Sequence, residues 1–271
     1  MSSSNYIIKI LNSPSPAMIA RFGSIEIKGV LYGKYPYLLW PLKNIIFKKL
    51  RRNAGFFSCN DKEVRQFSKM MLEDAKMVDV LGSWRKEEFF LSKYLRKAKK
   101  VPLRDLEPYF SDNPWSQALK DKNVLVIHPF SDTIKSQYNN NRQYLFEDKN
   151  VLPTFKSLQT ITAVQTIAGE PSKFNTWFDA LNYMKSQIDN LDFDVAIIGC
   201  GAYGFPLAAH IKRKGKKAIH MGGATQILFG IKGRRWLESD SFSNIINDYF
   251  VSPSKKDTPI KAKDIENGCY W

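Results

Sequence analysis

One stretch of this sequence decides its fold: Asp192-Phe193-Asp194-Val195-Ala196-Ile197-Ile198-Gly199-Cys200-Gly201-Ala202-Tyr203-Gly204, which continues as Phe205-Pro206-Leu207-Ala208-Ala209-His210-Ile211-Lys212. An apolar, β-branched run passes through a Gly-rich turn into a helical pattern, which is typical of a strand–turn–helix unit in an α/β protein. Small residues let a ligand approach the backbone, and the free N–H groups of a helix start attract phosphate or carboxylate. The stretch therefore predicts an anion-binding turn.

The glycine spacing of this turn also fits the dinucleotide fingerprint, Gly199-x-Gly201-x-x-Gly204. A dinucleotide fold needs an acidic residue at the end of the next strand, but that strand ends in His220-Met221-Gly222-Gly223. Only residues 205–271 follow the motif, too few for the rest of such a fold and a substrate domain. The same objections weaken an S-adenosylmethionine site. Two interpretations remain: a turn that serves close packing alone, or a contact to a phosphate or nucleotide sugar.

Strands alternate with helix-sized segments along the chain, which predicts a mostly parallel sheet flanked by helices. The predicted strands lie near 17–20, 77–82, 123–128, 158–167, 193–198 and 217–221, and the predicted helices at about 24–32, 61–79, 87–98, 133–146, 174–188 and 202–214. Ligands of such sheets bind at the carboxyl ends of strands. We therefore expect these strand ends to surround one cleft: Gly23, Gly82, His128, Gly199 and Gly222.

Length and composition predict a single α/β domain over residues 1–271, with a polar tail from about residue 252 whose end, Gly268–Trp271, can dock on the body. The chain has no signal-peptide pattern and no apolar run near the roughly 20 residues that span a bilayer. Its three cysteines are widely spaced and indicate neither a disulfide framework nor a zinc site. We therefore expect a cytoplasmic protein.

The formal net charge of +15 favours anionic partners. No recognised nucleic-acid module occurs, so no specific nucleic acid is expected. The segment Tyr35–Lys49 combines aromatic residues with a basic end, as a segment at the inner face of an anionic membrane would. A buried core helix is the favoured alternative for this segment.

The segment Arg21-Phe22-Gly23-Ser24-Ile25-Glu26 places an arginine at a strand end and a carboxylate in the first helical turn. Ser24 is a good N-cap, and Glu26 complements the helix dipole. A capping box would need its acid at Ile27, so Glu26 is available for another role.

Two further strand ends carry candidate groups. His128 ends a buried strand and is either a structural histidine or a catalytic or phosphate-binding one, and Ser131 or Asp132 can cap the next helix. The run His220-Met221-Gly222-Gly223 is a second Gly-rich turn, and two such turns suit a diphosphate. Zinc spacing, the Gly-x-Ser-x-Gly elbow and the Walker loop are all absent from the sequence, so hydrolase, kinase and ATPase functions have no support.

The segment 21–26 resembles the Arg-Phe/Tyr-Gly-Asp-Gly-Glu segment of bacterial GT-D-fold glycosyltransferases. Near the other end, Ile197-Ile198-Gly199, Pro206-Leu207-Ala208 and Ala218-Ile219-His220-Met221-Gly222 are similar to that family's last strand–helix–strand unit. The resemblance implies a Rossmann-like GT-D architecture with helical N-terminal additions. It also implies sugar transfer from a nucleotide diphosphate sugar, often UDP-glucose, to a glycan, lipid-linked or protein acceptor.

The family's Asp-x-Glu motif is associated with a divalent metal, Mn²⁺ or Mg²⁺, on the diphosphate. Here Ser24 stands at the Asp position and Glu26 matches the Glu. A serine is a weak ligand for these ions. Metal dependence is therefore not predicted, with Glu26 as the one candidate ligand.

Together these observations predict a glycosyltransferase that uses a nucleotide diphosphate sugar, with a UDP-sugar favoured, in bacterial polysaccharide or glycan biosynthesis. The predicted catalytic residues are Glu26 and His128. The predicted substrate-binding residues are Arg21, Gly23, Ser24, Asp132, Gly199, Gly201, Tyr203, Gly204, His220, Gly222 and Gly223. The alternative, favoured by Ser24, is a non-catalytic sugar-nucleotide-binding or scaffold protein of a membrane-proximal glycan assembly.

Overall fold

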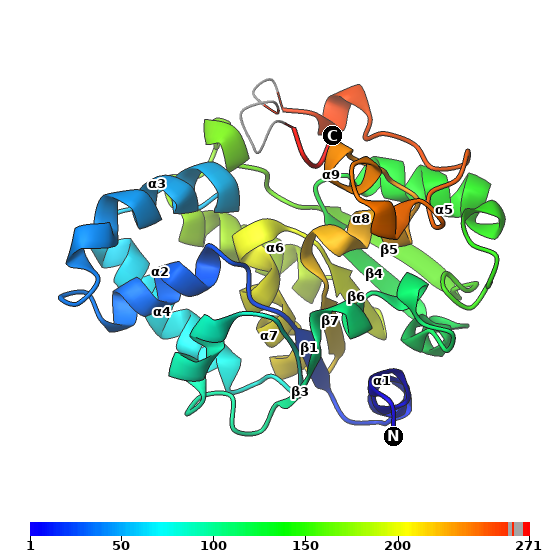
Figure 1. Ribbon diagram of the computed structural model, residues 1–271, viewed down its shortest axis with the longest axis horizontal. Helices are drawn as coiled ribbons and strands as arrows, with labels where there is room; N and C mark the ends of the chain where they lie inside the picture. The colour runs from blue at the N-terminus through cyan, green and yellow to red at the C-terminus, as the bar shows by residue number, and fades with distance from the viewer. Residues whose placement is uncertain (260–261, 263–267) are drawn as a thin grey trace.

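Seven parallel strands form one sheet in the computed structural model, which describes residues 1–259, 262 and 268–271 (Figure 1). Their order across the sheet is β3-β2-β1-β7-β6-β4-β5. The strands are β1 Ala17–Ala20, β2 Val80–Ser83, β3 Lys99–Pro102, β4 Asn123–His128, β5 Ser157–Thr162, β6 Val195–Ile198 and β7 Lys217–His220. The predicted α/β class with a parallel sheet is thus confirmed.

Helices cover both faces of the sheet. They are α1 Ser3–Asn12, α2 Glu26–Lys34, α3 Lys43–Ala54, α4 Asp61–Ala75, α5 Ser131–Leu145, α6 Trp177–Asp189, α7 Gly204–Arg213, α8 Thr225–Leu228 and α9 Arg234–Leu237. Helices α2, α3, α4, α6 and α7 share one apolar core, and α1, α5, α8 and α9 share the other. Neighbouring strand residues alternate between the cores, since Met18 joins the first and Ile19 the second.

The central strands are continuous apolar runs because both of their faces are covered. All four residues of β1 and of β6 are buried. Strands of this kind are typical of parallel sheets between two helical layers. They are also the elements that the sequence pattern predicts most directly.

Three local predictions were wrong. The segment 87–98 is not an α-helix: a 3₁₀ helix at Lys86–Leu91 is followed by turns and then by β3. Strand β3 was not predicted, because it is an edge strand in which only Val101 is buried and it therefore lacks an apolar run. Helix α2 begins at Glu26 after an N-cap at Ile25, so Ser24 does not cap it. The strand predicted at 158–167 ends at Thr162.

Strand order places four carboxyl ends side by side. Strands β1, β7, β6 and β4 are consecutive neighbours. Their register pairs Ile198 with His220, and Ile127 with Ile198. The residues that follow these strands therefore meet at one edge of the sheet. None of the helices in the described part of the chain has the length and apolar character needed to cross a membrane.

Candidate functional site

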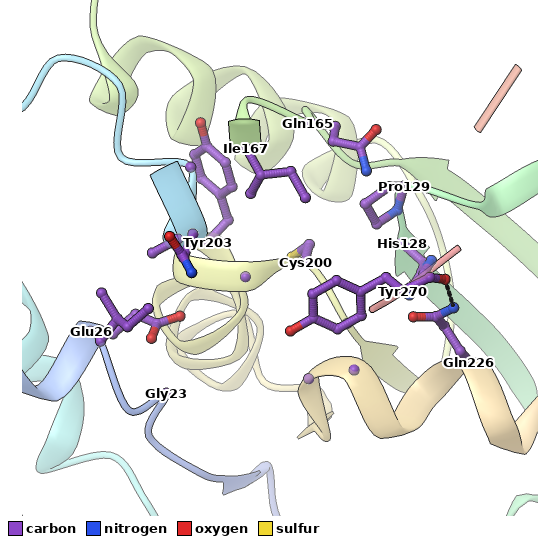
Figure 2. A pocket seen from close by; sticks show the side chains of 18 of the residues that line it. Gly23, Glu26, His128, Pro129, Gln165, Ile167, Cys200, Tyr203, Gln226 and Tyr270 are labelled. Carbon is purple, nitrogen blue, oxygen red and sulfur yellow. Dashed lines mark hydrogen bonds between the residues drawn. The ribbon is translucent and has the colours of Figure 1, made fainter. Parts of the chain in front are cut away.

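A cleft of about 200 Å³ lies at this edge of the sheet (Figure 2). Most of the predicted site residues line it: Arg21, Gly23, Ser24, Glu26, His128, Gly199, Gly201, Tyr203, His220, Gly222 and Gly223. The prediction that the ends of β1, β4, β6 and β7 surround one cleft is therefore confirmed. Gly82 does not line this cleft, because Leu106 and Leu103 pack directly against it.

Two other predicted residues lie outside the lining of the cleft. Asp132 is exposed in the first turn of α5, and neither it nor Ser131 caps that helix, whose N-cap is Phe130. Gly204 is buried, and a Cβ there would lie 2.2 Å from Cε1 of His220. Gly204 therefore serves helix–strand packing. Tyr203 lines the cleft, but its ring also stacks on buried Trp177 at a centroid distance of 4.7 Å.

The two Gly-rich turns pack against each other at the base of the cleft. A Cβ on Gly199 would lie 2.6 Å from the carbonyl oxygen of Gly222 and 2.7 Å from Cδ2 of His128. Gly201 and Gly222 adopt positive φ angles of 55° and 65°, which glycine tolerates best. The close contacts show that these glycines serve packing, and a contact to a phosphate or nucleotide sugar stays a prediction.

Arg21 is the cation at the centre of this arrangement. Its guanidinium lies 4.9 Å from the ring centroid of Trp84, and the missing Cβ of Gly222 leaves room for Nη1. Its Nε is buried and has no hydrogen-bond partner among the described residues. Burial lowers the pKa of Arg21, and nearby Glu26 opposes that effect. A desolvated guanidinium with an unused donor is suited to a bound anion.

Arg235 and Glu107 extend the charge around Arg21. Arg235 is exposed at the rim of the cleft, and its Nη1 lies 3.3 Å from the hydroxyl of Tyr270. Glu107 interacts electrostatically with both arginines, accepts a hydrogen bond from Tyr109 at 2.9 Å, and has a pKa raised by burial. Glu26 and Glu107 thus both act on Arg21, while Arg235 and Arg104 add positive charge around Glu107.

Glu26 folds back over the preceding turn. A Cβ on Gly23 would lie 1.8 Å from Oε2 of Glu26, so only glycine leaves space for the carboxylate. The backbone N–H groups of Ile25 and Glu26 lower the pKa of this carboxyl, and the N-cap of α2 makes no side-chain hydrogen bond. Burial raises the pKa of Glu26, and Arg21 opposes the shift. A carboxyl with a raised pKa beside a cleft is a candidate proton acceptor.

The residues around Glu26 do not fit a protein-built metal site. Ser24 supplies no carboxylate, so Glu26 is the single carboxylate of this turn. In the part of the chain that the structure describes, no three His, Cys, Asp or Glu side chains lie close enough to hold an ion together. The residues present therefore support no metal-dependent step.

His128 is held in one orientation by the backbone. The N–H of Phe130 donates to its Nδ1 at 3.0 Å, so the proton of the neutral ring is on Nε2. Burial lowers the pKa of His128 to about 3, which keeps the ring neutral at physiological pH. His128 is therefore a hydrogen-bond donor through Nε2, and its catalytic or phosphate-binding role stays a prediction.

His220 has the opposite tautomer. Its Nδ1 lies 3.3 Å from the carbonyl oxygen of Ile198, which can only accept, so Nδ1 carries the proton and Nε2 the lone pair. Burial lowers the pKa of His220 to about 3 as well. The cleft is thus lined by two neutral histidines with opposite tautomers.

Several lining residues were not among the predicted site residues. Trp84 directly follows β2, so the strand-end rule could have found it. Arg235, Tyr270 and Trp271 reach the cleft only because the end of the described chain docks beside α9. The backbone N–H of Arg235 donates to Cys269, and Gln226 donates to the carbonyl oxygen of Tyr270 at 3.0 Å. Figure 2 shows the Tyr270 ring extending across the cleft toward the side of Glu26.

Comparisons with known proteins add little to this geometry. No protein-family model matches the chain, and no curated protein matches it. Among solved structures, one described as "Selenomethionine substituted structure of domain of unknown function 1792 (DUF1792)" is similar over 93% of this chain and 90% of its own. The TM-score is 0.39 and the sequence identity 16%. A similarity this distant assigns no activity, so function rests on the cleft.

Proposed function

We propose that this protein is a glycosyltransferase that uses a nucleotide diphosphate sugar, with a UDP-sugar as the favoured donor, in bacterial polysaccharide or glycan biosynthesis. The observation that carries the proposal is Arg21, whose buried Nε has no partner among the described residues and whose guanidinium lies against the Gly222 turn. The resemblance of segment 21–26 to GT-D-fold enzymes supports the same conclusion.

The cleft has the donors that a departing diphosphate requires. Arg21 and Arg235 supply positive charge, His128 supplies an N–H group, and the Gly199 and Gly222 turns line the cleft. Donors that are already oriented stabilise charge that develops on a leaving group. This stabilisation is the main requirement for breaking the bond between the sugar and the diphosphate.

In the transfer step, the acceptor hydroxyl oxygen bonds to the anomeric carbon of the sugar. The bond from that carbon to the diphosphate oxygen breaks, and its electron pair stays on the diphosphate. The hydroxyl proton passes to the carboxylate of Glu26, whose raised pKa favours proton uptake. His128 donates a hydrogen bond from Nε2 to the nucleotide sugar.

A non-catalytic sugar-nucleotide-binding protein is the second candidate. One observation favours it: Ser24 stands where the family's motif has an Asp. Such a protein would keep the anion-binding cleft and lose turnover.

Thermal unfolding with a panel of nucleotide sugars tests binding, because a ligand that binds only the native state raises Tm. Hydrolysis of the same compounds, with and without Mn²⁺, tests turnover. UDP-glucose should raise Tm in the wild type and much less in Arg21→Met. Turnover with binding supports the transferase, and binding without turnover supports the second candidate. Absence of both would contradict both.

A further inference from the structure

A second hollow, of about 290 Å³, lies between α2 and α3 and is almost wholly apolar. Its aliphatic wall consists of Ile25, Leu31, Leu39, Leu42, Ile45 and Ile46. Ile25 also lines the cleft described above, so the two hollows are adjacent. We refer to this second hollow as the α2–α3 groove.

Large apolar side chains project from the segment that borders the groove. The exposed fractions are 89% for Tyr37, 77% for Leu38 and 59% for Trp40, and Ile45 and Leu42 are also exposed. Nothing in the described part of the chain covers these side chains. A contiguous exposed apolar surface of this kind marks an interaction site in a soluble protein.

Basic residues surround this apolar surface. Helix α3 contains Lys48, Lys49, Arg51 and Arg52 and no acidic residue. Lys28 and Lys49 also line the groove, together with one acidic residue, Glu87, which pairs with Arg85. Lys48 and Lys49 follow Ile45 by three and four positions, so these three side chains share one face of the helix. The surface thus has an apolar centre and a cationic margin.

We propose that this surface, residues 35–52 with the α2–α3 groove, docks on an anionic lipid bilayer. Tyr37, Leu38, Trp40 and Ile45 insert among the headgroups, and Lys48 and Lys49 pair with lipid phosphates. Aromatic side chains beside lysines that keep their charged ends in water are suited to a membrane interface. A protein partner fits less well because lysine is depleted at protein interfaces.

The shared residue Ile25 gives this docking a consequence for the reaction. If the cleft binds a nucleotide sugar, as proposed above, its opening lies next to the bilayer surface. The acceptor class that fits this placement is then a lipid-linked one, whose hydroxyl is presented at the membrane interface. This last step depends on the proposed function, whereas the docking itself does not.

Co-sedimentation with vesicles tests the docking on the full chain. The wild type should bind vesicles of phosphatidylcholine with phosphatidylglycerol, bind pure phosphatidylcholine vesicles at least tenfold more weakly, and dissociate at high salt. Leu38→Ser should weaken binding about tenfold, whereas Leu237→Ser, at a leucine of 59% exposure on α9, should not. Lys48→Glu with Lys49→Glu should weaken it likewise, in contrast to the exposed pair Lys255→Glu with Lys256→Glu.

Two further measurements keep the test decisive. Brominated lipids should quench tryptophan fluorescence in the wild type and far less in Trp40→Phe. Without vesicles, Tm and UDP-glucose binding should be the same in all variants as in the wild type. A failure of the proposed function would then appear as a lack of UDP-glucose binding in every protein, independently of binding to vesicles. No binding to anionic vesicles, equal loss in Leu38→Ser and Leu237→Ser, or burial of the surface in a stable dimer would overturn the proposal.

Discussion

His128 and His220 end the two strands on either side of β6, and their hydrogen bonds give them opposite tautomers. His128 ends β4 and accepts the N–H of Phe130 at Nδ1, so its Nε2 carries the proton. His220 ends β7 and donates from Nδ1 to Ile198, so its Nε2 carries a lone pair. The ring of His128 packs at Gly199 and the ring of His220 at Gly204, so the strand–turn–helix unit 195–213 separates a donor from an acceptor.

The donor role of His128 predicts how its substitutions behave. A glutamine amide can reach the position of Nε2, whereas an asparagine amide reaches only that of Nδ1. We expect His128→Gln to keep most of the affinity for UDP-glucose and His128→Asn to lose about tenfold, the scale of one hydrogen bond. Isothermal titration calorimetry measures both. Equal losses in the two variants would contradict a donor role for Nε2.

The low pKa values of the two histidines predict a loss of stability in acid. Both rings are neutral in the folded state down to a pH of about 3, whereas in the unfolded chain they protonate near pH 6.5. The unfolded state therefore binds more protons as the pH falls below 6.5, and the free energy of unfolding decreases. Each histidine should contribute about 2 kcal/mol of this loss between pH 6.5 and pH 5.

Urea unfolding at a series of pH values checks this loss. His128→Asn should be less stable than the wild type at pH 7, but its stability should fall less steeply between pH 6.5 and pH 5. The difference between the two slopes isolates His128 from other titrating groups. Parallel slopes would show that His128 is not held neutral by the fold.

The elements that the sequence predicted well are those whose pattern is set by burial. Strands β4 and β6 are apolar over their length because helices cover both faces, and no distant segment is needed to recognise them. The strand-end rule then places Gly23, His128, Gly199 and Gly222 at one edge. Strand β3 lacks this signal, because it lies at the sheet edge with a single buried residue.

The parts that the sequence did not predict depend on contacts between distant segments. Tyr270 reaches the cleft through contacts with Arg235 and Gln226, and neither residue is near it in the sequence. Glu26 folds over the preceding turn because Gly23 leaves space for the carboxylate, and Ser24 does not cap the helix. Both outcomes follow from packing in three dimensions, which residue spacing does not report.

Arg21 should dominate the affinity for the diphosphate. A hydrogen bond to a charged group contributes about 1.5–3 kcal/mol, so Arg21→Met should raise the Kd for UDP-glucose by about ten- to a hundredfold. Arg21→Lys should lose less, because it keeps the charge without the planar set of donors. The control is Arg96→Met at an exposed arginine. Calorimetric titration distinguishes them, and unchanged binding by Arg21→Met would remove the basis of the proposed function.

The raised pKa of Glu26 predicts that binding depends on pH. A bound diphosphate places negative charge near this carboxyl and raises its pKa further, so that binding takes up a proton. Affinity for UDP-glucose should therefore increase as the pH falls through the range where Glu26 titrates, by at most tenfold per unit for one proton. The diphosphate diester does not titrate there, and both cleft histidines stay neutral.

Replacing the carboxyl separates Glu26 from other groups. Glu26→Gln should bind UDP-glucose with an affinity independent of pH and close to the wild-type value at low pH, while transfer is lost. Binding measured from pH 5 to pH 8 tests this. A pH dependence that persists in Glu26→Gln would assign the proton to another residue, with Glu107 the next to substitute, since its pKa is also raised by burial.

Gly199 should be the least replaceable glycine of the cleft. A Cβ there meets the Gly222 carbonyl oxygen at 2.6 Å and the His128 ring at 2.7 Å, both held in place by the sheet. Overpacking of this kind costs about 1–3 kcal/mol, so Gly199→Ala should lower the free energy of unfolding by that amount. Gly215→Ala is the control, because Gly215 has a φ of 82° and no atom within 4 Å of the added Cβ. It should cost only about 1–2 kcal/mol of backbone strain and leave UDP-glucose binding intact.

Gly199→Ala should also weaken binding, since the His128 ring must move to make room. A Gly199→Ala protein with wild-type affinity would show that the turn serves packing alone.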